Sequence, residues 1–105
     1  MARDKVGNIV GKGDMRAQIE QVGKNVEGCL QAAGASVKDI VWTTSYVTDT
    51  AAFSENADLR ARYFGPDRGA TRTLGPYVPA SSTVAVQSLA APDFFVEVEA
   101  IAVIN

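Results

Sequence analysis

Two carboxylates stand in an otherwise apolar stretch near the end of the chain. Glu97 and Glu99 interrupt residues 94–103, which are otherwise Phe, Val, Ala and Ile. Burying an unpaired carboxylate is costly, so each of these groups needs a partner or a chemical role. In the preceding segment, Ser81 and Thr83 could donate hydroxyl hydrogen bonds to a polar ligand, or they could be ordinary residues of a strand edge.

The chain contains no histidine and a single cysteine, Cys29. The lack of histidine removes the commonest general base, every Ser-His or Cys-His nucleophile and the usual nitrogen ligand of zinc. One cysteine excludes an intramolecular disulfide, and its position on an apolar helix face predicts a small core residue rather than a nucleophile. Any chemistry must use carboxylates, hydroxyls, arginines, backbone groups or bound water, and we expect neither a metal nor a cofactor.

The elements that position these residues follow from periodicity and turn residues. Apolar residues at three- and four-residue spacing predict a helix that Asp14 caps and Gly34 ends, with Gln18 mostly off its apolar face. The other predicted elements are a strand over 39–48, a helix over about 49–64, and strands over 82–87 and 94–103.

The last predicted strand has two different faces. Its even-numbered residues, 94 to 102, carry no polar side-chain atom and should lie against the helices. The odd-numbered residues, with Glu97 and Glu99 among them, form a face that a subunit interface or a cleft would explain. Trp42, in the strand over 39–48, could be a core residue or an interface contact.

Composition limits the class of protein. The chain has 105 residues, 47% hydrophobic and 21% charged, which predicts one globular domain over residues 1–105. A net charge of -2 argues against a nucleic-acid binder that works through a basic surface. No apolar run approaches membrane-spanning length and no signal pattern opens the sequence, so we expect a cytoplasmic protein without membrane contacts.

Matching residues also run from one end of the chain to the other in the order of a known family. The stretch Val-Glu-Val-Glu-Ala-Ile-Ala, residues 96–102, is the most distinctive. The other matching segments are Asn8-Ile9-Val10, Gly13-Asp14, Gln18, residues 32–36, 39–41 and 46–49, Phe53, Tyr63-Phe64 and Pro79-Ala80. On these residues the chain resembles the Rid family, the reactive intermediate deaminases also called the YjgF group.

The resemblance implies an α+β, chorismate-mutase-like fold: a mixed sheet with two helices packed on one face. It also implies a homotrimer with small-molecule clefts between neighbouring subunits. The best-known members hydrolyse enamines and imines, such as 2-aminoacrylate, to 2-keto acids and ammonia. In them a Glu on the last strand helps to place the attacking water, and this residue corresponds to Glu97 here. The alternative is a structural carboxylate tied to backbone amides or to an arginine.

Three positions depart from the family pattern. The Arg that follows the Pro-Ala step and pairs with the substrate carboxylate is Ser81 here. The cysteine that follows it closely in many deaminases is Thr83, and the Asn of the second helix is Ala57. The carboxylate clamp is therefore missing from its usual place, and Ser81 and Thr83 become candidate contacts for a neutral or smaller polar ligand.

The predicted loop over 65–79 is longer than is usual in the family, and long loops often line a site or an interface. Arg72, or Arg68, could reach back to replace the missing guanidinium, although exposed loop arginines are usually only solvated. Tyr77 could stack against a ligand or simply pack beside Pro76. Family members also begin with a β-hairpin that carries a Ser-Gly-Gln segment, and since the chain shows none, we expect an N-terminally shortened fold.

The sequence therefore predicts a Rid-type hydrolase or deaminase that acts on a small enamine or imine without the usual Arg. Glu97 would orient water, with Ser81, Thr83, Arg72 and Tyr77 as candidate substrate contacts. The alternative is a non-catalytic trimer that binds small ligands or acts as a holdase. A ribonuclease, which some family members have been described as, fits poorly with an acidic chain that has no histidine.

Overall fold

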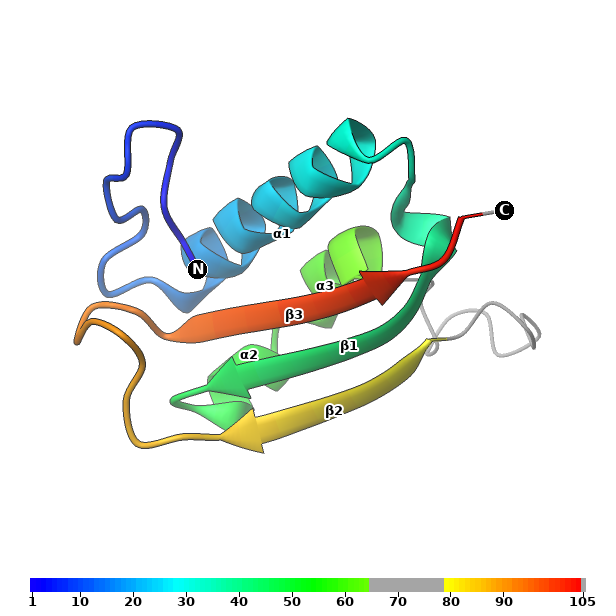
Figure 1. Ribbon diagram of the computed structural model, residues 1–105. Helices are drawn as coiled ribbons and strands as arrows, with labels where there is room; N and C mark the ends of the chain where they lie inside the picture. The colour runs from blue at the N-terminus through cyan, green and yellow to red at the C-terminus, as the bar shows by residue number, and fades with distance from the viewer. Residues whose placement is uncertain (65–78, 105) are drawn as a thin grey trace.

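The computed structural model describes residues 1–64 and 79–104 (Figure 1). The first helix, α1, spans Met15–Ala32. The Asp14 side chain accepts a hydrogen bond from the Ala17 amide at 3.1 Å, so it caps the helix as predicted. Gly34 follows with a φ of +79°, the left-handed conformation that commonly ends a helix. Both ends are set by local residues, which is why the sequence predicted them.

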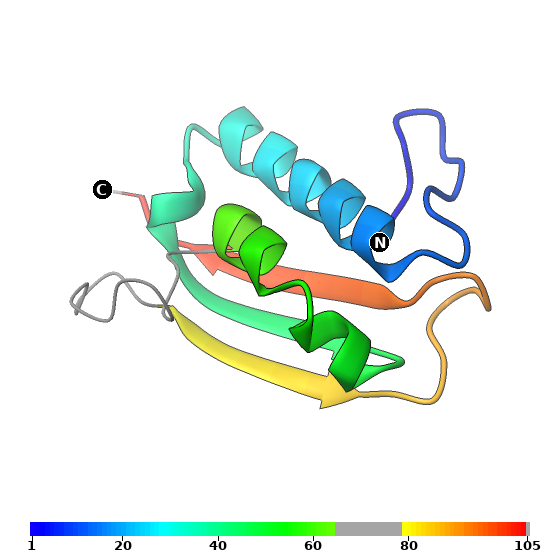
Figure 2. The same cartoon turned by 180° about the vertical axis from the view of Figure 1, so that it is seen from behind.

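The next element is a 3-10 turn that was not predicted, η1 (Val37–Asp39). The others follow in the predicted order: β1 (Ile40–Val47), α2 (Thr50–Ser54), α3 (Ala57–Phe64), β2 (Ala80–Ala85) and β3 (Val96–Ala102). The strands form a mixed sheet in the order β2-β1-β3, with β1 parallel to β2 and antiparallel to β3. The α-helices lie on one side of this sheet (Figure 1, Figure 2). The predicted α+β class, with a mixed sheet covered by helices on one face, is confirmed.

The hydrophobic core lies between the helices and one face of the sheet. Its most deeply buried members are Ala2, Ile19, Val22, Val47, Phe53, Phe94 and Val96. On β3 the residues with even numbers face this core, as the alternation predicted, whereas Glu97, Glu99 and Ile101 point to the other side. No described helix covers that other side of the sheet, and Trp42, Val84 and Ile101 on it are exposed.

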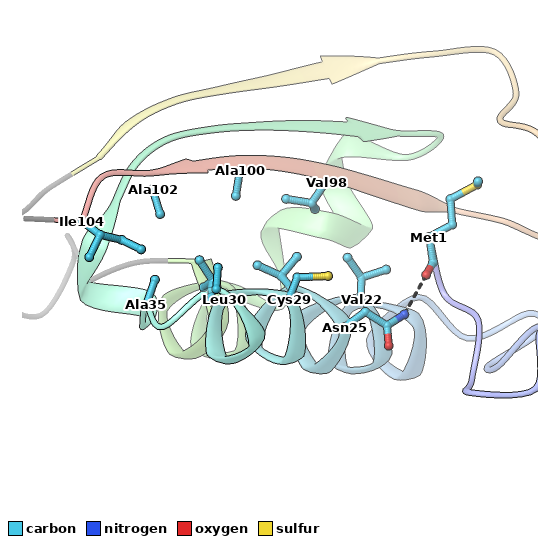
Figure 3. Close-up of a pocket in the computed structure, with 12 residues that line it drawn as sticks. Met1, Val22, Asn25, Cys29, Leu30, Ala35, Val98, Ala100, Ala102 and Ile104 are labelled. Carbon is cyan, nitrogen blue, oxygen red and sulfur yellow. Dashed lines mark hydrogen bonds between the residues drawn. The ribbon is translucent and has the colours of Figure 1, made fainter.

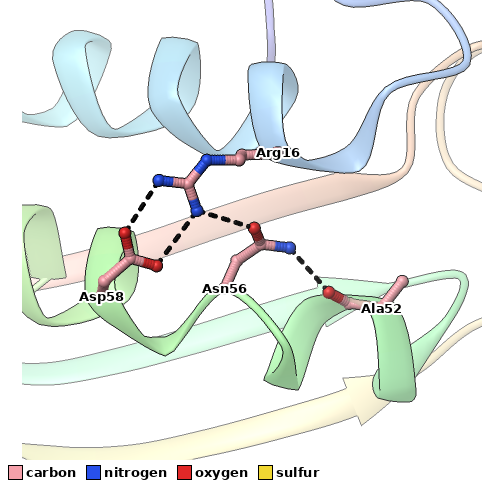
Figure 4. A network of polar contacts seen from close by, with 4 residues as sticks. All are labelled: Arg16, Ala52, Asn56 and Asp58. Atoms are coloured by element: carbon pink, nitrogen blue, oxygen red, sulfur yellow. Dashed lines mark hydrogen bonds and ion pairs between the residues drawn. The ribbon is translucent and has the colours of Figure 1, made fainter.

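The second predicted helix is divided in two, so the prediction of one continuous helix over 49–64 was wrong at this point. α2 ends at Ser54, and the side-chain amide of Asn56 donates to the Ala52 carbonyl at 2.8 Å. The oxygen of the same amide accepts from Arg16 at 3.0 Å, and Arg16 also donates to both carboxylate oxygens of Asp58, at 3.1 and 2.8 Å (Figure 4). A tertiary contact from α1 therefore fixes the break between α2 and α3.

Gln18 is fully buried, although the sequence placed it mostly off the apolar face of its helix. Its amide nitrogen donates to the Gly11 carbonyl at 3.1 Å and to the Asp93 carbonyl at 2.6 Å. Its amide oxygen accepts from the backbone amide of Phe95 at 2.8 Å. Burial is tolerated because every polar group of the side chain has a partner, and these bonds hold α1 to the segment that leads into β3.

Candidate functional site

The uncovered side of the sheet, called here the outer face, carries the two carboxylates. It consists of Trp42, Thr44 and Tyr46 from β1, Ala80, Ser82 and Val84 from β2, and Glu97, Glu99 and Ile101 from β3, which are paired in register across the three strands. Three of its apolar side chains are substantially exposed: Trp42 at 52%, Ile101 at 54% and Val84 at 41%. Trp42 is therefore not a core residue. The outer face combines a large apolar area with two acids, as the sequence predicted for β3.

The two carboxylates on this face have different surroundings. The phenol of Tyr46 donates a hydrogen bond to a carboxylate oxygen of Glu99 at 3.4 Å. The negative charge of Glu99 is the main reason why the pKa of the Tyr46 phenol is raised, and reduced hydration, the hydrogen bond itself and the charge of Glu97 add to it. Glu97 is half-buried, and its carboxylate forms no hydrogen bond or ion pair with any residue in ranges 1–64 and 79–104.

Ser81 and Thr83 lie on the opposite side of the sheet from Glu97. They are paired in register with Thr43 and Ser45, which are buried on the helix side, and register partners point to the same face. Both side chains are exposed, as is every residue of β2, which is an edge strand of the described sheet. One chain therefore does not bring Ser81 and Thr83 together with Glu97, and a site that uses both sets needs a second copy.

Two predicted contacts, Arg72 and Tyr77, lie outside the described residues, as does Arg68. Within the described part of the chain, no three side chains of the types that ligate metals gather in one place. No helix within the same residues is long and apolar enough to cross a membrane.

A groove of about 470 Å³ separates α1 from the helix-facing side of β3 (Figure 3). Its lining is almost entirely apolar: Met1, Val22, Asn25, Val26, Cys29, Leu30, Ala33, Ala35, Val98, Ala100, Ala102 and Ile104. Cys29 is exposed in this groove, so the expectation that it is a core residue was wrong. Asn25, the one polar side chain of the lining, is already held by bonds to the carbonyls of Met1 and Arg3. Of the predicted site residues that the structure describes, Ser81, Thr83 and Glu97, none lines the groove.

The comparison with known families agrees with the α+β fold described above. The model of the family described as endoribonuclease L-PSP matches residues 1–104, which is nearly the whole chain. The chain belongs to this family, the Rid or YjgF family. The resemblance seen in the sequence is thereby confirmed, and the sheet with its uncovered outer face is a Rid-type fold.

Rid relatives with known structures are similar over almost all of this chain. The YyfB protein of Yersinia pestis, a Rid protein of unknown function, superimposes with a TM-score of 0.78 at 32% identity and covers 98% of this chain and 72% of its own. RidA from an Antarctic Psychrobacter gives 0.76 at 27% identity, covering 98% and 74%. A RutC family protein of Pyrococcus horikoshii is 37% identical over 98 residues, 93% of this chain and 68% of the relative.

Proposed function

We propose that this Rid protein hydrolyses a small enamine or imine to a carbonyl compound and ammonia, at clefts between the subunits of a cytoplasmic homotrimer. The observation that carries the proposal is that Glu97 is partly buried and has no bonded partner among the described residues. The residue is half-buried, and no group within residues 1–64 and 79–104 is bonded to its carboxylate, so the carboxylate is available to a water molecule or a ligand. A structural carboxylate at this depth would need a partner.

The outer face supports assembly. Exposed apolar patches on a small protein commonly mark protein–protein contacts, and Trp42, Val84 and Ile101 form such a patch around the carboxylates. A neighbouring copy that packs against this face would exclude water from Glu97 and strengthen its interactions. The same assembly would supply the second half of the site, since Ser81 and Thr83 of one copy can approach Glu97 only in another copy.

The chemistry needs no histidine. An enamine first takes a proton on carbon and loses one from nitrogen, which gives the neutral imine. Glu97 then accepts a proton from water as the water oxygen bonds to the imine carbon, and the nitrogen takes a proton as the carbon–nitrogen double bond becomes single. The resulting carbinolamine expels ammonia and leaves a carbonyl group, so that one imine and one water give one carbonyl compound and one ammonia. A positioned carboxylate can supply this general-base step.

The test is ammonia release from freshly generated substrates that differ in their charge: 2-aminoacrylate, 2-aminomuconate and propan-2-imine, which has no carboxylate. The variant Glu97→Gln keeps the shape of the side chain and removes the base. A general base typically contributes about 100- to 10,000-fold, so we expect at least a 100-fold loss of kcat. Glu55→Gln, an exposed carboxylate at the end of α2, is the matched control. Equal rates in wild type and Glu97→Gln would remove Glu97 from the mechanism.

A second candidate, a trimer that binds a small molecule or acts as a holdase without catalysis, is favoured by one observation. β2 carries no Lys or Arg, so the strand that holds the substrate carboxylate in the best-known Rid deaminases has only hydroxyls to offer. Ser81→Arg separates the two candidates. If the cleft is otherwise intact, this variant should gain hydrolysis of 2-aminoacrylate, whereas a folded trimer with no gain on any substrate would favour the binding role.

A further inference from the structure

The charged groups of the outer face favour a ligand that carries a positive charge. Every ionised group on this face is negative: β3 contributes Glu97 and Glu99, while the positions that β1 and β2 contribute are uncharged. The other titratable group is the Tyr46 phenol, whose pKa is raised, chiefly by the charge of Glu99; it is neutral when protonated and adds no positive charge. Within the described residues, no cation on the outer face offsets the two acids.

The aromatic side chains beside Glu97 and Glu99 also favour a bound cation. The phenol of Tyr46 is hydrogen-bonded to Glu99 and so fixes one of the two acids. Glu99 is paired in register with Thr44, which lies between Trp42 and Tyr46 along β1, so an exposed indole flanks the acids on one side. Aromatic faces and carboxylates both attract organic cations, and the attraction grows when a neighbouring molecule excludes water.

We propose that this site selects its substrate as a protonated imine, an iminium cation, that carries no carboxylate group. The inference rests on the proposed function and names the substrate class of the same site. The iminium carbon is more electrophilic than that of the neutral imine, and Glu97 and Glu99 stabilise its charge. Water gives one proton to Glu97 as its oxygen bonds to the carbon, which leaves a neutral carbinolamine. Glu97 returns this proton to the nitrogen, the carbon–nitrogen bond breaks, and the departing ammonia takes the hydroxyl proton. One iminium ion and one water thus give one carbonyl compound and one ammonium ion.

A carboxylate on the substrate would have an unfavourable position. It would lie near two acids of the same sign, and β2 presents only the Ser81, Ser82 and Thr83 hydroxyls in place of a guanidinium. A hydroxyl donates one neutral hydrogen bond, which is weaker than a bidentate pair with Arg. The preference for cations without a carboxylate therefore follows from both faces of the sheet.

Binding of stable amines tests the preference without requiring turnover. Isopropylamine, which is protonated at pH 7, and alanine differ only by a methyl group in place of the carboxylate, and isobutyrate has the carboxylate without the amine. We expect NMR titration of the assembled protein to give at least a 10-fold lower Kd for isopropylamine than for alanine, with shifts at Tyr46, Glu97 and Glu99. Isobutyrate should not compete.

Two variants complete the experiment. Glu99→Gln removes one of the charges and should raise the Kd of isopropylamine about 10-fold, whereas Glu55→Gln, just after α2, should leave it unchanged. Absence of saturable binding by isopropylamine, or equal binding of alanine, would overturn the inference. The two proposals fail differently: cation selectivity without any ammonia release removes only the hydrolase, and faster hydrolysis of 2-aminoacrylate than of propan-2-imine removes only the iminium preference.

Discussion

Replacing Gln18 by methionine removes a polar side chain that joins three segments of the chain. Gln18 is 0% exposed, and its amide group bonds to Gly11 in the loop before α1 and to Asp93 and Phe95 in the segment that leads into β3. Methionine has a similar volume and flexibility but cannot replace these bonds. The expected cost therefore comes from backbone groups that lose their partner and not from a cavity.

The structure limits how many groups are affected. The Gly11 carbonyl keeps a second hydrogen bond, from the Asp14 amide at 2.9 Å, so it remains paired. The Phe95 amide and the Asp93 carbonyl lose the partner that Gln18 provides. An unsatisfied buried group costs about 1–3 kcal/mol, and we expect the variant to lose about 3 kcal/mol of unfolding free energy. This corresponds to roughly a 100-fold change in the unfolding equilibrium and a Tm lower by roughly 10–20 °C.

Urea unfolding followed by circular dichroism measures this loss, with all variants at one protein concentration because assembly would add to the apparent stability. Gln21→Met is the matched control on the same helix: among residues 1–64 and 79–104, the Gln21 side chain donates only to the Asn25 side chain, at 2.9 Å. We expect the control to lose less than about 1 kcal/mol. A Gln18→Met protein within about 1 kcal/mol of wild type, or no more affected than the control, would refute the argument that these bonds hold β3 to α1.

Two further predictions concern helix packing and pH. A methyl group at Gly23 would overlap the ring of Tyr63, so Gly23→Ala should cost about 1–3 kcal/mol, whereas Gly28 has open space around it and Gly28→Ala should gain about 0.5–1 kcal/mol. Calorimetry measures the Tm of each variant, and Tm shifts of the same sign in both variants would contradict this packing. The hydrogen bond from Arg16 lowers the pKa of Asp58 to about 2, so its contribution is present above the unfolded value of about 4 and is lost as pH falls toward 2. Asp58→Asn should flatten the stability curve in that window of an acid titration, and an unchanged curve would show that the ion pair has no effect.

Local signals in the sequence predicted the helices and strands, and they also predicted which face of β3 packs on the core. Asp14 and Gly34 set the ends of α1, and alternation on β3 separated the core residues from Glu97 and Glu99. The break between α2 and α3 was missed, since it depends on the bonds of Asn56 to a residue of another helix. The burial of Gln18 was missed for the same reason, because its partners near β3 are distant in the sequence.

The roles of the candidate site residues stay predictions. Alternation along β3 places Glu97 on the outer face and the resemblance to the Rid family suggests its role, whereas the position of Ser81 and Thr83 relative to it depends on the register between β1 and β2. Periodicity within a strand says which residues share a face, but it does not say which face of one strand continues into the next. The groove between α1 and β3 was also missed, although its apolar helix positions, Cys29 among them, had been assigned to a core.

The candidate site has polar groups on both sides of one sheet, and this arrangement makes its activity depend on a second copy of the chain if both sets act on one substrate. A carboxylate on the outer face and hydroxyls on the helix side cannot converge within a chain, because register partners keep their faces along the whole ladder. If both sets contact one substrate, the reaction depends on assembly, and loss of the interface removes activity without unfolding the chain. The apolar residues around the carboxylates, Trp42, Val84 and Ile101, would then determine the activity as directly as Glu97 does.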